Sequence, residues 1–192
     1  MRRALLSNLV CSLALLALPA GALAAGPVIQ GGMLRTALTD QGGARYGSLD
    51  GGGYKVGFEV GSHRWRSEWA FNQNILTGYN EALAGNHRLS LTGFSYQLTF
   101  LFRETGLTPY VGLGAEMGVA SFWESGYDFY QTNDRYSGEW SDNSEGVYLR
   151  PYGIAGLRLQ FGFGLAIRAE LTASYYYEFF GVGTNLGISY TW

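Results

Sequence analysis

Cysteine, lysine and long apolar runs are nearly absent from this chain of 192 residues. The only cysteine is Cys11 and the only lysine is Lys55, so the other twelve of its 13 basic residues are arginines. A single cysteine excludes a disulfide framework, and a net charge of -2 argues against nucleic acid as a partner. Beyond residue 25 no apolar run reaches the roughly 18 residues that a membrane-spanning helix requires.

The first part of the chain has the layout of a cleavable signal peptide, predicted to span residues 1–24. A positively charged start precedes a mostly apolar stretch, and Ala22-Leu23-Ala24 supplies the small residues that signal peptidase requires. A transmembrane anchor is the alternative, but the apolar stretch is short for that purpose. We therefore expect an exported protein whose residues 25–192 form one barrel domain.

Glycine and aromatic residues are abundant, at 29 glycines and 16% aromatics, which favours an all-β chain. The clearest pattern runs from Leu165 to Glu178, where apolar residues alternate with others that include Arg168 and Glu170. Alternation places the two sets on opposite faces of a strand. At about 3.3 Å per residue and a tilt of about 40°, this segment rises roughly 33 Å, enough to cross an outer membrane.

Seven further segments alternate with varying clarity, so the sequence predicts an all-β fold, a single antiparallel eight-stranded transmembrane barrel. The expected strands are 28–38, 54–61, 65–72, 93–102, 111–119, 147–159, 165–178 and 185–192. Short turns, expected in the periplasm, alternate with longer extracellular loops, as in bacterial outer-membrane barrels. The long loops are expected at 40–53, 73–87 and 124–146, and a brief outer connection at 179–183.

Two motifs resemble those of the small eight-stranded outer-membrane barrels, the OmpA-like and opacity-type surface antigens of Gram-negative bacteria. The chain ends in Leu186, Ile188, Tyr190 and Trp192, similar to the terminal signal that the barrel-assembly machinery reads. The stretch Thr108-Pro109-Tyr110-Val111-Gly112-Leu113-Gly114-Ala115 is similar to the one that opens the fifth strand of these barrels. The resemblance implies location in the cell outer membrane, assembly with periplasmic chaperones and that machinery, and contact with outer-membrane lipid and lipopolysaccharide.

Nine charged side chains fall on the inward face of the expected strands: Lys55, Glu59, Arg66, Glu68, Glu116, Arg150, Arg158, Arg168 and Glu170. An eight-stranded barrel is just wide enough to be filled by side chains, so we expect these charges to pair with each other. A narrow gated ion path through the same residues is the alternative. Gly112, Gly114 and Gly118 on that face leave room for a large neighbour such as Tyr152 or Tyr176.

The segment 124–146 is the main candidate for binding an extracellular ligand, because it combines acidic with aromatic residues. Its candidate aromatic residues are Tyr127, Phe129, Tyr130, Tyr136 and Trp140. Such a mixture suits a cationic surface, a sugar or calcium, although the spacing of a calcium-binding loop is missing. A solvated, variable loop without a specific ligand is the simpler alternative.

The sequence offers little support for catalysis. Its two histidines are His63, expected at a periplasmic turn without a nearby acid, and His87, which faces away from Ser90. We therefore expect no enzyme, metal site or cofactor. The expected role is a surface antigen, an adhesin-like protein or a membrane stabiliser. The alternatives are a small porin-like transport barrel and a lipid-modifying outer-membrane enzyme.

Overall fold

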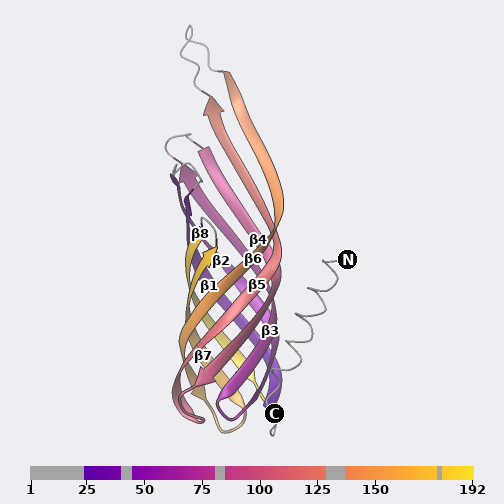
Figure 1. Cartoon of the computed structure of the whole chain (residues 1–192), viewed down its shortest axis with the longest axis vertical. Helices are drawn as coiled ribbons and strands as arrows, with labels where there is room; N and C mark the ends of the chain where they lie inside the picture. Colours follow the sequence, from indigo (N-terminus) through magenta and orange to yellow (C-terminus); the bar gives the residue numbers. More distant parts are fainter. Residues whose placement is uncertain (1–23, 40–44, 81–84, 129–136, 177–178) are drawn as a thin grey trace, which may run out of the picture.

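The computed structural model describes residues 24–39, 45–80, 85–128, 137–176 and 179–192. They form eight strands that pair in chain order and close into one antiparallel barrel, so the predicted fold class is confirmed (Figure 1). The strands are β1 (Ala24–Thr39), β2 (Arg45–Ser62), β3 (Trp65–Asn80), β4 (Gly85–Leu101), β5 (Gly106–Asp128), β6 (Ser137–Gln160), β7 (Leu165–Tyr176) and β8 (Phe179–Tyr190). Pairing of β1 with β8 closes the barrel. None of the described residues belongs to a helix that is long and apolar enough to cross a membrane.

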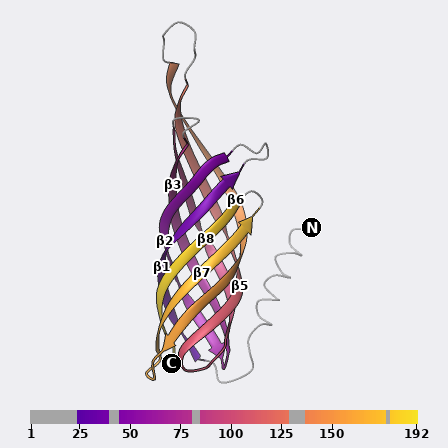
Figure 2. The same cartoon turned by 90° about the vertical axis from the view of Figure 1, so that its left-hand side faces the viewer.

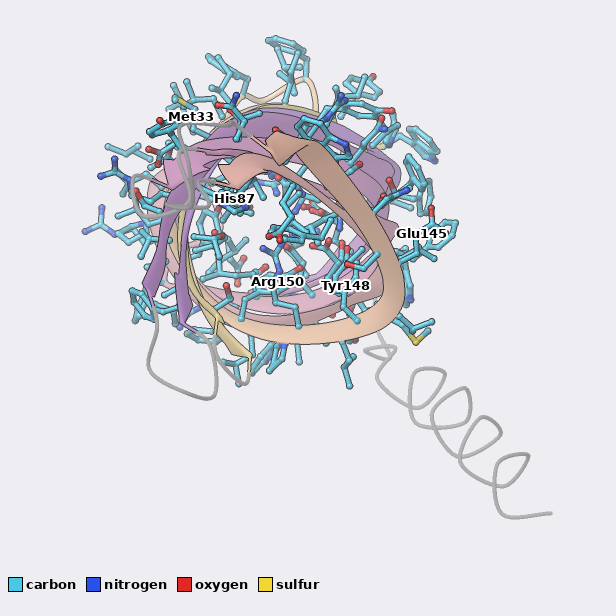
Figure 3. The ribbon with its side chains drawn as sticks, turned by 90° about the horizontal axis from the view of Figure 1, so that it is seen from above. Met33, His87, Glu145, Tyr148 and Arg150 are labelled. Carbon is cyan, nitrogen blue, oxygen red and sulfur yellow. The ribbon has the colours of Figure 1, made fainter. Side chains whose placement is uncertain are left out.

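The alternation that predicted the strands also decides which side chains face the lumen. Along β4, buried residues alternate with more exposed ones without a break. Viewed down the barrel axis, Met33 and Glu145 point away from the barrel, whereas His87, Tyr148 and Arg150 point into it (Figure 3). A two-residue period therefore separates an outer surface from a filled interior.

The outer face of the barrel carries large exposed apolar side chains from every strand. Examples, one from each strand in order, are Ile29, Val56, Ile75, Phe94, Leu113, Leu149, Leu171 and Leu186. A soluble protein rarely exposes apolar surface of this extent. A continuous outward band is instead the surface that a transmembrane barrel presents to lipid.

Three tight connections gather at one end of the barrel, the lower end in Figure 1. They join β2 to β3, β4 to β5 and β6 to β7. The positive-φ residues His63 and Gly164 lie in two of them, and Gly106 directly follows the third. Glycine adopts this left-handed conformation without a steric penalty. The three short turns that the sequence predicted are confirmed. The chain end lies here too, since the Trp192 amide donates to the Ala25 carbonyl at 3.1 Å.

At the opposite end the strands are longer than the sequence predicted. The expected loop 124–146 is largely a hairpin, because β5 continues to Asp128 and β6 begins at Ser137. The expected loops at 40–53 and 73–87 are likewise wrong over much of their length, since β2, β3 and β4 extend into them. Beyond the lipid both faces of a hairpin can meet water, so strands continue without the apolar alternation that revealed them elsewhere.

The connection between the last two strands is also shorter than predicted. β8 begins at Phe179, so the predicted connection at 179–183 is strand, while residues 177 and 178 at the end of the predicted strand 165–178 lie outside the described residues. Tyr175 pairs with Phe180 across the hairpin. Gly181 and Gly183 lie within this strand, where a side chain added at either would come within 2.7 Å of Ser174 Oγ or Thr172 Oγ1.

The β5–β6 hairpin rises above the other strands (Figures 1 and 2). We call its projecting part the arm and define it as residues 121–128 and 137–145. β4 accompanies β5 only as far as Glu124, which pairs with His87. β7 pairs with β6 only from Tyr152 to Gln160. Among the described residues, one edge of β6 above Tyr152 therefore has no neighbouring strand.

Candidate functional site

Arg168 of β7 lies at the centre of the barrel interior, where three carboxylates surround its guanidinium. Nη1 is 3.3 Å from Glu59 Oε2, Nη2 donates to Glu68 Oε2, and Nε is 3.7 Å from Glu170 Oε1. These residues are nearly inaccessible to solvent. The planar fork of arginine can serve several carboxylates at once, which is how a charge is accommodated away from water.

Two further cations complete this group. Arg158 Nη1 donates to Glu59 Oε2 at 2.7 Å, and Lys55 Nζ lies 2.8 Å from Glu68 Oε1 and 3.8 Å from Glu170 Oε2. We call the six residues the charged cluster: Lys55, Glu59, Glu68, Arg158, Arg168 and Glu170. Three cations face three carboxylates, so the cluster is balanced and fills the lower lumen with paired side chains.

The other predicted interior charges lie outside the charged cluster. Glu116 and Arg150 are direct cross-strand partners on β5 and β6, with Arg150 Nη2 2.6 Å from Glu116 Oε2. Tyr148 donates its hydroxyl proton to Glu116 Oε1. Arg66 is half-buried on the lumen side, and its Nε and Nη1 atoms find no hydrogen-bond partner among the described residues.

Two tyrosines of the paired strands β5 and β6 point into the barrel interior, near the charged side chains. Tyr110 pairs with Gly156, and Tyr152 pairs with Gly114, so each ring lies over a glycine of the opposite strand. The Tyr110 hydroxyl donates to Glu170 Oε1 at 2.8 Å. The structure therefore places Tyr152 against Gly114, as the sequence suggested. The side chain of Tyr176 lies outside the described residues.

Between the charged cluster and the arm, the lumen contains an apolar layer that the sequence did not predict. Its members, at most 7% exposed, are Leu34, Leu49, Leu76, Leu89, Leu91 and Tyr148. A cavity of about 50 Å³ adjoins the layer, with Lys55, Asn72, Glu116 and Arg150 among its lining residues. That volume holds only a few water molecules. An apolar constriction of this kind opposes the passage of ions because it expels water.

The two histidines lie at opposite ends of the barrel. His87 is buried in the arm-side mouth, with Nδ1 3.4 Å from Glu124 Oε2 and its ring stacked on Phe122. His63 lies in the turn after β2, and its Nδ1 is 3.8 Å from Glu104 Oε1. The prediction that no acid lies near His63 is therefore wrong, because Glu104 belongs to the adjacent turn. Among the described residues no group of three or more metal-ligating side chains is present.

The predicted ligand-binding aromatics belong to the arm and its tip. Tyr127 lies in β5 and Trp140 in β6, near the last described pairs of the hairpin. Phe129, Tyr130 and Tyr136 lie outside the described residues. Their role in binding a ligand stays a prediction.

The four residues of the predicted assembly signal share the outer face at the turn end of the barrel. Leu186, Ile188, Tyr190 and Trp192 are between 44% and 69% exposed. The Trp192 ring lies edge-on to Phe58 of β2, with centroids 6.4 Å apart. Recognition of this segment by an assembly machinery stays a prediction, but its side chains are accessible on the barrel surface.

Comparison with solved structures places the fold among known proteins. The barrel resembles Neisserial surface protein A with a TM-score of 0.54 at 10% sequence identity, over 86% of this chain and 97% of that one. That protein is a small eight-stranded outer-membrane barrel. This chain has the same fold.

Two other small barrels of the outer membrane are also similar. The attachment invasion locus protein Ail of Yersinia pestis, solved with the heparin analogue sucrose octasulfate, gives a TM-score of 0.49 at 18% identity, over 87% of this chain and 99% of that one. The N-terminal barrel domain of Pseudomonas aeruginosa OprF gives 0.43 at 16% identity, with the same coverage. No protein-family model matches the sequence of our barrel. No curated protein matches it either.

Proposed function

We propose that the protein is an integral barrel of the Gram-negative outer membrane that presents the arm outside the cell as a non-enzymatic, adhesin-like surface antigen. The turn end would face the periplasm, and the arm end would face the medium. The barrel then serves as an anchor whose interior neither conducts nor catalyses. Its surroundings would be outer-membrane lipid and lipopolysaccharide.

The apolar outer band that surrounds a filled interior is the observation that carries this proposal. A closed barrel satisfies its backbone hydrogen bonds internally, which lipid demands of any spanning segment. The charged cluster and the apolar layer together occupy the lumen, which favours an anchor over a channel. The hairpin that projects furthest is then the part available to a partner.

Cysteine labelling tests the location and the orientation together. In a Cys11→Ser background, Ser144→Cys places an exposed thiol on the arm, and Thr105→Cys places one at a turn. A membrane-impermeant maleimide should label Ser144→Cys in intact cells, and Thr105→Cys only after the outer membrane is permeabilised. Labelling in the reverse order, or no labelling of Ser144→Cys in intact cells, would contradict the proposal.

Conductance in planar bilayers tests the closed interior separately. The purified protein should give no steady current. A steady current that changes with Glu116→Ala or Arg168→Ala would instead favour a small porin-like transporter that uses the lumen as its path.

A further inference from the structure

Arg66 is the one interior cation that forms no ion pair within the described part of the chain. The nine interior charges comprise five cations and four carboxylates. The other four cations each pair with a carboxylate: Lys55, Arg150, Arg158 and Arg168. A charge held away from water without a partner is costly, so an interior with one excess positive charge favours the uptake of a negative ion.

The guanidinium of Arg66 lies at the turn end of the lumen, over a glycine. Arg66 pairs with Gly61 of β2, and a methyl carbon added at Gly61 would lie 2.8 Å from Nη1 of Arg66. The Nε and Nη1 atoms are shielded from solvent, and both lack a hydrogen-bond partner among the described residues. The hydroxyl of the neighbouring Thr99 donates to the Arg66 carbonyl at 3.4 Å and does not accept from the guanidinium. Arg66 therefore retains unused N–H donors in a place that water does not reach.

Arg158 adds a second unused donor to the same region. It is 3% exposed, and its Nη1 and Nε donate to Glu59 Oε2 at 2.7 Å and to Gln160 Oε1 at 3.1 Å. Its Nη2 atom has no partner in the described part of the barrel. Arg66 and Arg158 act electrostatically on each other and on Glu59, so the two guanidiniums lie in one neighbourhood. Guanidinium N–H groups are strong donors to anions, and here two side chains supply them together.

The carboxylates around this region limit the charge of the ion that fits. Glu59 is already shared between Arg158 and Arg168. The charge of Glu104 also reaches Arg66, but the Glu104 side chain is 53% exposed at the turn. One excess positive charge is balanced by a single negative charge, whereas a doubly charged anion would leave a negative excess beside Glu59. Arg66 is half-buried and Arg158 is fully buried, so the ion would enter from the turn end.

We propose that Arg66 and Arg158 together bind a small, singly charged inorganic anion at the turn end of the barrel interior. The anion would accept hydrogen bonds from the unused N–H groups and complete the charge balance of the interior. Chloride and singly charged phosphate share this chemistry. The inference goes beyond the proposed function, because it adds a bound ion to the anchor and depends on neither the location nor the arm.

Unfolding of the full-length protein by urea in lipid vesicles tests the stabilisation by the ion. Sodium gluconate keeps the ionic strength constant, because gluconate is too bulky to enter between the arginines. Raising chloride from about 1 to about 100 mM should lower the unfolding equilibrium constant about tenfold. A parallel series uses phosphate at a mildly acidic pH, where it carries mostly a single charge. Stabilisation by either anion supports the site, and the anion that acts at the lower concentration identifies its occupant.

Two variants separate this site from a general effect of salt. Arg66→Gln removes the excess cation, so in gluconate it should be at least as stable as the unaltered protein, and its stability should not depend on chloride. The matched control, Arg103→Gln, removes an exposed arginine at the same end and should keep the full chloride dependence. Equal chloride dependence of Arg66→Gln and the unaltered protein would overturn the inference.

Bromide in crystals of the unaltered protein locates the ion without any variant. Anomalous scattering should show a bromide ion in contact with the guanidiniums of Arg66 and Arg158. Bromide at the protein surface alone would mean an adventitious ion only and would also overturn the inference. Failed surface labelling in cells combined with interior bromide would instead contradict the proposed location while the anion site stands.

Discussion

Glu59 accepts hydrogen bonds from both Arg158 and Arg168, so two cations share one carboxylate in the barrel interior. A cation left without its partner away from water is much less stable than an exposed one. The free energy of unfolding of the whole barrel should therefore respond to the loss of a single interior carboxylate.

Replacing that carboxylate by an amide should be costly. Glu59→Gln should lower the free energy of unfolding by about 3–5 kcal/mol, because buried Arg158 loses its carboxylate partner, whereas Arg168 keeps Glu68 and Glu170. Urea unfolding in lipid vesicles, followed by tryptophan fluorescence, measures this. Glu104→Gln, which removes an exposed carboxylate at a turn, should have little effect. Equal stability of Glu59→Gln and the unaltered protein would show that water hydrates the interior and replaces the lost charge.

Gly114→Ala tests the packing of the interior tyrosines. The added methyl carbon would lie 2.5 Å from Cζ of Tyr152, so the ring must move, at a cost of about 1–3 kcal/mol. Gly114→Ala combined with Tyr152→Leu should recover part of that loss, as measured by the same urea unfolding. Gly153→Ala is the matched control, because its nearest neighbour would be 4.0 Å away. Loss of stability in the control alone would contradict this account.

At the scale of strands and hairpins, the sequence predicted the strand segments that carry the apolar outer band. It missed the extensions of these strands at the arm end of the barrel. Alternation assigned Glu116 and Arg150 to the lumen face, but their contact depends on the register of β5 against β6, which alternation does not encode. Leu49 and Leu76 fell in segments expected to be loops, and Leu89 in the unassigned stretch before the strand at 93–102, so the apolar layer they form could not be anticipated. In the arm and directly below it, where residues 143–147 are exposed without a break, the two-residue pattern that marks a strand is missing.

Thiol reactivity should report whether the apolar layer excludes water. Ser174→Cys, in a Cys11→Ser background, places a thiol in the buried interior beside the cavity. Its reaction with a small polar maleimide should be slow, and Leu76→Ser should make it at least about tenfold faster by hydrating the layer. A thiol on the arm, Ser121→Cys, should react at the same rate in both backgrounds. Fast reaction of Ser174→Cys with the layer intact would show that water already passes.

Removal of the arm should leave the barrel intact. Deleting residues 126–144 joins Ser125 to Glu145, and because Ser121 pairs with Glu145, residues 122–125 can form the new turn. The shortened protein should still migrate faster on SDS gels when unheated than when boiled. Loss of the heat-dependent migration would mean that the arm contributes to closing the barrel.

For the molecule as a whole, assembly in the cell and stability once folded should respond to different residues. Trp192 is 69% exposed on the outer face, so its loss should cost the folded barrel little. We expect Trp192→Ala to refold from urea into detergent normally but to lower the amount assembled in the outer membrane of cells. Trp192→Phe should restore assembly, because an aromatic end is retained. Equal amounts of Trp192→Ala and the unaltered protein in the membrane would show that the end is not read.

The backbone hydrogen bond between Trp192 and Ala25 holds the two ends of the barrel domain side by side. A short linker across that contact and a new opening between Phe161 and Gly164 would give a circular permutant that begins with β7 and ends with β6. Its final shape should be unchanged, while Leu186 to Trp192 would then lie inside the chain. The yield of such a permutant in cells would show whether an assembly signal must come last, or need only face outward at the periplasmic rim.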